Sequence, residues 1–176
     1  MKPGQSGPDV ELTEGLLEFL TTLEQAGVRM AVATSASRKR ARYVLEHFDL
    51  ENRFSAIVSG EDVAHGKPDP EVYYSACRRI DADTSTALVI EDAVSGVMGA
   101  KAAGIRCLGI ADAKRTQLLY RAGADYVVPD FRRYTRVARG EVGTSARKGD
   151  CGGEFETRCK AVWDVLRCAH CRQHQH

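Results

Sequence analysis

Two kinds of hydrophobic periodicity alternate along residues 12–131, and this alternation limits the fold more than any other feature of the sequence. In chain order, helical and extended segments follow one another, the helical one first in each pair, at 16–23, 28–33, 41–48, 56–58, 70–80, 87–90, 94–103, 107–110, 117–122 and 126–128. Gly27 and Gly104 stand where two of the helices should end. Alternating helices and strands predict an α/β fold, a parallel sheet covered on both faces by helices.

The composition is that of an ordinary globular domain. The chain has 176 residues, of which 43% are hydrophobic and 28% are charged, and its net charge is +1. A net charge this small gives no reason to expect nucleic acid as a partner, and no apolar run approaches the roughly 20 residues of a membrane span. The first nine residues also lack the apolar core of a secretory signal. We therefore expect a cytoplasmic protein without nucleic-acid or membrane partners, in which Cys77 and Cys107 are core residues.

The regular pattern ends after Phe131. Residues 132–176 are rich in Arg, Gly and Cys, and their one apolar stretch, 161–166, is short enough to form at most a small helix. The composition predicts a disordered start at 1–11, a core domain at 12–131 and a disordered tail at 132–176. The tail holds soft metal ligands, although their spacing matches no paired zinc framework. These ligands are Cys151, Cys159, Cys168, His170, Cys171, His174 and His176.

Two adjacent carboxylates follow the most apolar of the expected strands. Residues 88–92 read Leu-Val-Ile-Glu-Asp, so Glu91 and Asp92 fall at the carboxyl end of a buried strand. Open α/β sheets bind their ligands at that edge, and carboxylate oxygens suit a hard divalent cation. The alternative is a solvated turn or a pair of helix-start charges. The strand context favours a metal site.

Three short motifs fall at equivalent places, each just after an expected strand or in the loop that follows it. They are Thr34-Ser35, residues 66–70 (Gly-Lys-Pro-Asp-Pro), and Glu91-Asp92. In order and spacing they resemble motifs two, three and four of the haloacid dehalogenase superfamily, in the wording of its β-phosphoglucomutase and phosphatase branch. The resemblance implies a three-layer Rossmann-like core and Mg²⁺-dependent phosphoryl transfer on a small phosphorylated metabolite.

Roles for the first two motifs follow from the resemblance and suit the chemistry. Thr34 would donate its hydroxyl to a phosphoryl oxygen, with the backbone N–H of Ser35 beside it at a helix start. Thr34 and Ser35 could equally cap the helix that follows, as could Ser37. The catalytic Lys67 would neutralise the attacking carboxylate and the bound phosphate, and its alternative is a solvated loop lysine. His65 is expected to be a plain loop histidine.

The fourth motif would hold the metal. The resemblance makes Asp92 a direct Mg²⁺ ligand and Glu91 its neighbour, bonded to the ion or to its water molecules. Phosphoryl transfer depends mainly on positioning and on charge stabilisation, which a hydroxyl, a lysine and a magnesium ion around one phosphate would provide.

The sequence departs from the family at its beginning. Members carry an early apolar strand that ends in Asp-x-Asp, whose first Asp attacks phosphorus and whose second is the general acid and base. Residues 9–13 (Asp-Val-Glu-Leu-Thr) come near this motif, but the residues before them cannot form a buried strand. In the family that strand lies between the strands that here end at Ala33 and Ile90. The chain is thus expected to be truncated, lacking this strand, the nucleophile and the helical cap.

Three outcomes are open for the sheet: the flanking strands close the gap, a partner chain fills it, or the domain is only marginally stable. Without the nucleophile, we expect negligible turnover of phosphomonoesters by the isolated chain. Two alternatives remain: a non-catalytic binding or regulatory module, and the product of a defective gene model. The identity of the substrate is not expected to be readable from this chain, because specificity in the family comes largely from the cap.

Overall fold

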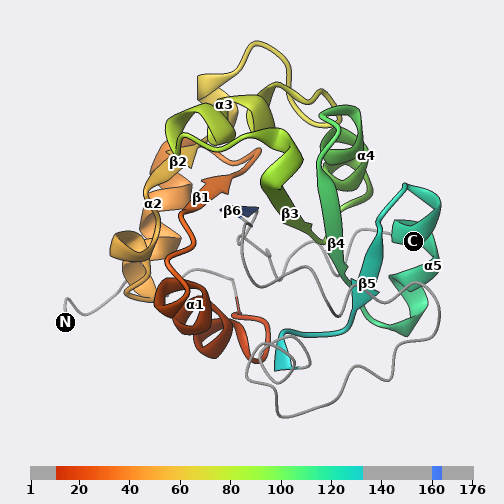
Figure 1. The fold of residues 1–176 in the computed structure, drawn as a ribbon, viewed down its shortest axis with the longest axis horizontal. Helices are drawn as coiled ribbons and strands as arrows, with labels where there is room; N and C mark the ends of the chain where they lie inside the picture. Colours follow the sequence, from red (N-terminus) through yellow and green to blue (C-terminus); the bar gives the residue numbers. More distant parts are fainter. Residues whose placement is uncertain (1–10, 133–159, 164–176) are drawn as a thin grey trace, which may run out of the picture.

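The computed structural model describes residues 11–132 and 160–163, which build an α/β domain around one parallel sheet. The strand order is β2-β1-β6-β3-β4-β5 (Figure 1). The strands are β1 (Met30–Ala33), β2 (Ala56–Val58), β3 (Ala87–Glu91), β4 (Arg106–Ile110), β5 (Tyr126–Val128) and β6 (Lys160–Trp163). The helices are α1 (Leu16–Gln25), α2 (Arg38–His47), α3 (Glu71–Arg79), α4 (Val94–Ala102) and α5 (Ala113–Arg121). This architecture confirms the predicted fold class.

Successive residues of the strands enter two separate cores, because side chains of a strand point alternately to the two faces of the sheet. On β1, Ala31 belongs to the core under α3, α4 and α5, whereas Val32 belongs to the core under α1. On β3, Val89 and Leu88 divide in the same way. Because both faces of these strands are buried, their sequences are continuously hydrophobic.

The predicted helices are present, with small changes at their ends. Gly27 and Gly104 have φ angles of +69° and +71°, a left-handed conformation that glycine adopts without strain and that ends α1 and α4. Helix α5 begins four residues earlier than expected, because the side chain of Asp112 accepts a hydrogen bond from the backbone N–H of Arg115 and caps it. Among the described residues, no helix has the length and hydrophobicity needed to cross a membrane.

The two predicted core cysteines are buried. Cys77 lies on α3 and Cys107 on β4, and both are free thiols. Burial raises the pKa of Cys77, and it raises that of Cys107 further, with the charges of Glu91 and Asp125 adding to the effect. Thiols held protonated in this way are packing residues rather than nucleophiles.

The central place of the sheet is taken by β6, from the C-terminal part of the chain. Strand β6 lies between β1 and β3 (Figure 1) and runs parallel to both. In the register of the sheet, Trp163 is opposite Val32 of β1 and Ile90 of β3. The expectation of a helix in the stretch 161–166 is therefore wrong for residues 161–163, which are extended because two strand edges offer them backbone partners. A segment of the same chain occupies the gap, so the flanking strands do not close it and a partner chain is not needed to fill it. Marginal stability of the domain stays a prediction.

Strand β6 joins two halves of the sheet. In the register of the described strands, β1 pairs with β2 and β6, and β3 pairs with β4 and β6. Without β6, the backbone groups that face the gap from β1 and β3 would lie in the core without hydrogen-bond partners, which proteins avoid. The rest of the predicted tail, including its cysteines and histidines, lies outside the described residues.

The central position of β6 predicts a large effect of proline. Val162 lies opposite Ala31 and Val89, and proline there removes a backbone donor from the middle of the sheet. We expect Val162→Pro to lower the free energy of unfolding by at least about 2 kcal/mol, since a buried acceptor also loses its partner. Val162→Thr, which keeps the N–H and the β-branch, is the control. Urea unfolding measures both, and equal stability of the two variants would contradict this placement of β6.

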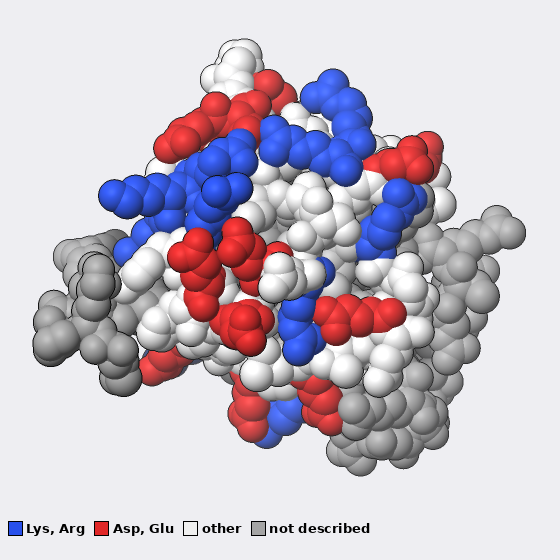
Figure 2. All heavy atoms as spheres, turned by 90° about the vertical axis from the view of Figure 1, so that its left-hand side faces the viewer, with Lys and Arg blue, Asp and Glu red and all other residues white. Residues whose placement is uncertain are grey.

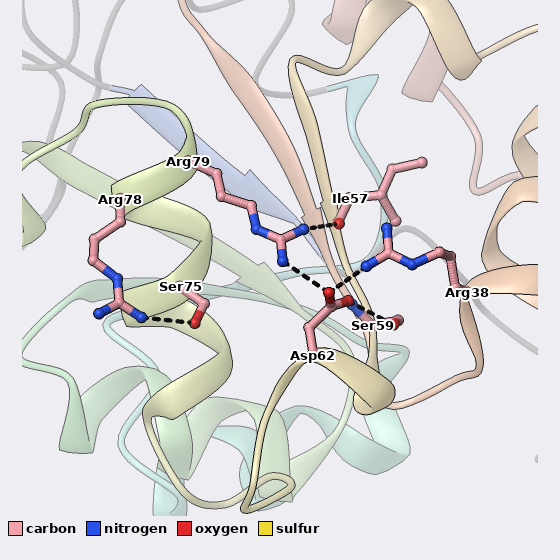
Figure 3. A network of polar contacts seen from close by, with 7 residues as sticks. All are labelled: Arg38, Ile57, Ser59, Asp62, Ser75, Arg78 and Arg79. Atoms are coloured by element: carbon pink, nitrogen blue, oxygen red, sulfur yellow. Dashed lines mark hydrogen bonds and ion pairs between the residues drawn. The ribbon is translucent and has the colours of Figure 1, made fainter.

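A partly buried carboxylate ties α2, β2 and α3 together on one side of the domain (Figure 3). Asp62 accepts hydrogen bonds from the backbone N–H and the hydroxyl of Ser59, at 2.8 and 2.6 Å. Its carboxylate also forms ion pairs with Arg38 of α2 and, at 2.7 Å, with Arg79 of α3, which in turn donates to the carbonyl of Ile57. Burial alone would raise the pKa of Asp62, but the hydrogen bonds from Ser59 and the charge of Arg79 outweigh it and lower the pKa well below its usual range.

This lowered pKa predicts acid sensitivity. The carboxylate of Asp62 stabilises the fold fully above the unfolded-state pKa of about 3.9, and that contribution is lost as the pH falls toward the lower folded-state pKa. We expect Asp62→Asn to cost roughly 2 kcal/mol at pH 7, with the deficit shrinking below about pH 4. The control is Asp81→Asn, because the side chain of Asp81 is 95% exposed. Thermal unfolding followed by circular dichroism from pH 7 to 3 tests this, and a deficit independent of pH would contradict it.

Candidate active site

Four of the predicted site residues lie where β1 and β3 end. Thr34 follows β1 directly, Glu91 is the last residue of β3, and Asp92 comes next. Lys67 reaches the same edge from the loop before α3. The carboxyl edge of a parallel sheet is where such folds bind ligands, so the topology brings the predicted residues to a suitable place.

Lys67 links the ends of the two strands. Its ammonium donates to the carbonyl oxygen of Ala33 at 3.0 Å and to Oε1 of Glu91 at 2.5 Å. The side chain of Lys67 is only 4% exposed, and its nitrogen lies 5.1 Å from the ring centre of Tyr73. A lysine held this way is not a solvated loop residue, so that alternative is excluded. It places a positive charge at the sheet edge.

Glu91 lies inside the protein rather than on its rim. The residue is 1% exposed, and the hydroxyl of Tyr73 donates to the same Oε1 atom that binds Lys67, at 2.6 Å. A Cβ atom added to Gly96 would lie 2.1 Å from the carboxyl carbon of Glu91. Glycine is therefore required in the first turn of α4, because the carboxyl group fills the space that a side chain would need.

The carboxylate of Glu71 holds the loop that carries Lys67 through hydrogen bonds to the loop backbone. The carboxylate of Glu71, at the start of α3, accepts hydrogen bonds from the backbone N–H groups of Ala64, at 3.0 Å, and His65, at 2.9 Å. The hydrogen bonds from Ala64 and His65, in that order, lower the pKa of Glu71. The imidazole of His65 is mostly exposed and lies 3.5 Å from Glu71. His65 is thus part of the loop, as expected, and Glu71 fixes where the loop turns toward the site.

Thr34 does not cap the next helix. It is 3% exposed, its N–H donates to the carbonyl of Val58, and its hydroxyl oxygen accepts from the N–H of Ala36 at 3.1 Å. The cap of α2 is Ser37, whose hydroxyl accepts from the N–H of Arg40. Capping therefore belongs to Ser37, and the hydroxyl proton of Thr34 is not used by that cap. Ser35 is exposed at the same turn.

The two metal ligands predicted from the sequence, Glu91 and Asp92, differ in how deeply they are buried. Asp92 is half-buried, and its backbone carbonyl accepts a hydrogen bond from Arg115 of α5 at 2.5 Å, whereas Glu91 faces inward to Lys67. Within residues 11–132, no group of three or more carboxylate, imidazole or thiol side chains is close enough to hold a metal. The Mg²⁺ site and the individual roles of the site residues stay predictions.

Sequence reasoning missed three residues that shape this site: Tyr73, Glu71 and Arg115. Tyr73 follows Lys67 by six residues, a separation that crosses a loop and a helix start, so no periodic pattern connects them. Arg115 is one of several arginines on an exposed helix, and nothing in its neighbourhood marks it. Glu71 was the easiest of the three to predict from the sequence, because an acid in the first turn of a helix is a recognisable signal.

Comparison with known proteins agrees with the fold and the motifs. Residues 3–110 match the model of the haloacid dehalogenase-like hydrolase family. The chain therefore belongs to this family. It is 35% identical over 124 residues to validoxylamine A 7'-phosphate phosphatase of Streptomyces hygroscopicus, which covers 70% of this chain and 57% of that protein. It is 38% identical over 91 residues to a phosphorylated carbohydrates phosphatase of Thermotoga maritima, covering 52% and 42% of the two chains.

Solved structures give the same result. The structure of CbbY from Rhodobacter sphaeroides with phosphate superimposes with a TM-score of 0.62 at 30% identity, over 68% of this chain and 54% of that one. A family hydrolase from Deinococcus radiodurans with bound phosphate and sodium gives a TM-score of 0.65 at 29% identity, over 73% and 58%. The chain spans about half the length of the curated relatives it matches.

The buried ion pair of the site should couple strongly. Lys67→Met leaves a buried carboxylate without its cation, and Glu91→Gln leaves a buried ammonium without its anion. Each single variant should therefore lose more stability than the net contribution of the ion pair to folding. In a double-mutant cycle by urea unfolding we expect a coupling free energy of about 3 kcal/mol or more. Arg53 and Glu24 form a more exposed pair at 3.1 Å. The matched cycle Arg53→Met and Glu24→Gln should give less than about 1 kcal/mol. Similar coupling in both cycles would show that the site pair is no stronger than a surface pair.

Proposed function

We propose that this site binds the phosphoryl group of a small phosphorylated metabolite in a hydrolase or mutase reaction of the haloacid dehalogenase type. The observation that carries the proposal is the position of the Lys67 ammonium, which is buried between the ends of β1 and β3 and donates to the carbonyl of Ala33, the residue before Thr34. A fixed positive charge beside a hydroxyl donor is what a tetrahedral dianion requires. The phosphatases among the relatives support the substrate class.

The surroundings of Thr34 add to the attraction for an anion. Helix α2 begins four residues later, and its first turn carries Lys39 and Arg40, both exposed. Cations at a helix N-terminus are unfavourable for the helix itself. They are favourable for a bound phosphate. Figure 2 shows the side of the molecule on which α2 lies, where Lys and Arg side chains gather on part of the face among acidic ones.

Mg²⁺ fits this site in a limited way. Asp92 is the one predicted ligand whose side chain is not already held in the interior, so we assign it the direct contact, with Glu91 keeping Lys67 in place. Magnesium commonly binds through one or two carboxylates together with substrate phosphate and water, and such a site needs no complete protein cage. When bound, the ion would neutralise charge on the phosphoryl oxygens.

The covalent step is a separate matter from phosphate binding. The predicted site residues within 11–132 include two carboxylates: Glu91, which is engaged with Lys67, and Asp92, which we assign to the metal. These residues support the proposal of phosphate binding, and negligible turnover stays a prediction. A non-catalytic binding module is the second candidate function, and it shares the prediction of phosphate binding.

Phosphate binding tests the proposal directly. We expect the full chain to bind inorganic phosphate in the presence of MgCl₂ in isothermal titration calorimetry. Thr34→Val should weaken this binding about 10-fold or more, the size of one hydrogen bond to a charged group. Thr22→Val on α1 is the control, because the Thr22 hydroxyl donates only to its own helix, to Glu18. Absence of phosphate binding by the unchanged protein would refute the proposed function.

A further inference from the structure

The hydroxyl of Tyr73 and the ammonium of Lys67 bind the same oxygen atom of Glu91. Oε1 of Glu91 accepts a hydrogen bond from the ammonium at 2.5 Å and another from the hydroxyl at 2.6 Å. The shorter range of O–H···O distances, which includes this one, is typical of a hydroxyl that donates to an ionised carboxylate. The negative charge of Glu91 is therefore shared between a positive donor and a neutral donor, and the positive donor is the one that we assign to the phosphate.

The surroundings of Tyr73 hold this hydroxyl in one place. Tyr73 is fully buried on α3, and its hydroxyl also lies 3.0 Å from the carbonyl oxygen of Gly96, at the start of α4. A Cβ atom added to Gly99 would lie 3.0 Å from the ring, so the ring packs directly against the backbone of α4. The ring centre is 5.1 Å from the nitrogen of Lys67, within the range of a cation–π contact. The hydroxyl therefore stays beside Glu91 when the contacts of Lys67 change.

A ligand that binds Lys67 competes with Glu91 for the charge of the ammonium. Withdrawing the cation from a buried carboxylate is strongly unfavourable, because it leaves an uncompensated charge in the interior. A second donor on the same oxygen lowers this cost, since a hydrogen bond to a charged group contributes more than one between neutral groups. The Tyr73 hydroxyl is such a donor. It compensates the carboxylate while the ammonium turns part of its charge toward a bound anion.

We propose that Tyr73 is a positioning residue of this site: its hydroxyl stabilises the Glu91 carboxylate during ligand binding and so makes the Lys67 ammonium available to a phosphoryl group. This inference rests on the proposed function, because it needs a phosphate bound by Lys67. When phosphate binds, the contact between Lys67 and Glu91 weakens and the hydrogen bond from Tyr73 to Glu91 strengthens. Tyr73 acts through these two residues and not on the ligand itself.

The simpler alternative is a purely structural hydroxyl, which satisfies the buried carboxylate of Glu91 equally well with and without a ligand. Loss of the hydroxyl would lower the free energy of unfolding in both cases, because a buried acceptor loses a donor. Stability measurements therefore do not separate the two roles. They differ in phosphate affinity, which depends on the hydroxyl only if the Tyr73–Glu91 hydrogen bond changes when phosphate binds.

Phosphate affinity of the Tyr73→Phe variant tests the inference. This substitution keeps the ring, and with it the packing on α4 and the contact with Lys67, and removes only the hydroxyl. In isothermal titration calorimetry of the full chain with MgCl₂, we expect the Kd for inorganic phosphate to rise about 10-fold or more, the size of one hydrogen bond to a charged group. Tyr74→Phe is the matched control, because Tyr74 is the next residue of α3 and is 41% exposed. It should leave the Kd unchanged.

Near-ultraviolet difference spectroscopy measures the hydrogen bond itself and starts from the unchanged protein. The absorbance of tyrosine moves to longer wavelength when its hydroxyl becomes a stronger donor, so saturating phosphate should give a red-shifted tyrosine difference spectrum. The chain has six tyrosines. Comparison of the two variants assigns the signal, which Tyr74→Phe should keep and Tyr73→Phe should lose.

The possible results separate this inference from the proposed function. If Tyr73→Phe binds phosphate as tightly as the unchanged protein, or if saturating phosphate gives no tyrosine difference spectrum, the inference is wrong and the proposed function stands. If Tyr73→Phe does not fold, the spectrum of the unchanged protein decides alone. If the unchanged protein binds no phosphate, the proposed function fails first, and this inference fails with it.

Discussion

The buried ion pair between Lys67 and Glu91 is the interaction on which the site and the centre of the sheet both depend. Taking two charges out of water is costly, and their attraction repays this cost only if other hydrogen bonds satisfy them. Here the carbonyl of Ala33 accepts from the ammonium, and the hydroxyl of Tyr73 donates to the carboxylate. The pair thus links β1, β3 and α3 at one point, and the missing side chain of Gly96 makes room for it.

An arrangement of this kind makes more sense for function than for stability. A well-packed apolar pair of similar size is often as stable as a buried ion pair, or more so. A charged pair positioned at the carboxyl edge of the sheet has a use that an apolar pair lacks, because it fixes a cation where a dianion can be bound. The loop contacts of Glu71 serve the same end, since they set the position from which Lys67 extends. Lys67 is thus positioned directly by its contact with Glu91 and indirectly by the contacts of Glu71 with the loop.

The sequence was sufficient for the parts of the fold that local pattern determines. Periodicity located the strands ending at Ala33, Val58 and Val128, and the short motifs located Thr34 and Lys67, because spacing and chain order carry that information. It was not sufficient where contacts join distant residues. The inward orientation of Glu91 depends on Tyr73, 18 residues away, and the strand at 160–163 depends on two edges formed more than 60 residues earlier. An isolated apolar run of four to six residues is compatible with helix or strand, and only its partners decide.

The late position of β6 in the chain links completion of the sheet to formation of the site. Strands β1 and β3 are separated by 53 residues, counting from Ala33 to Ala87, and β6 follows β3 by 68, counting from Glu91 to Lys160. Contacts at such separations form late, because loop closure must precede them. The ammonium of Lys67 bonds to the ends of β1 and β3, the two strands that flank β6, so a phosphate bound at the assembled site favours the state with β6 in place by mass action. Ligand binding and insertion of the central strand are therefore expected to stabilise each other. A site at the junction between two halves of a sheet binds its ligand best when the central strand joins the two halves.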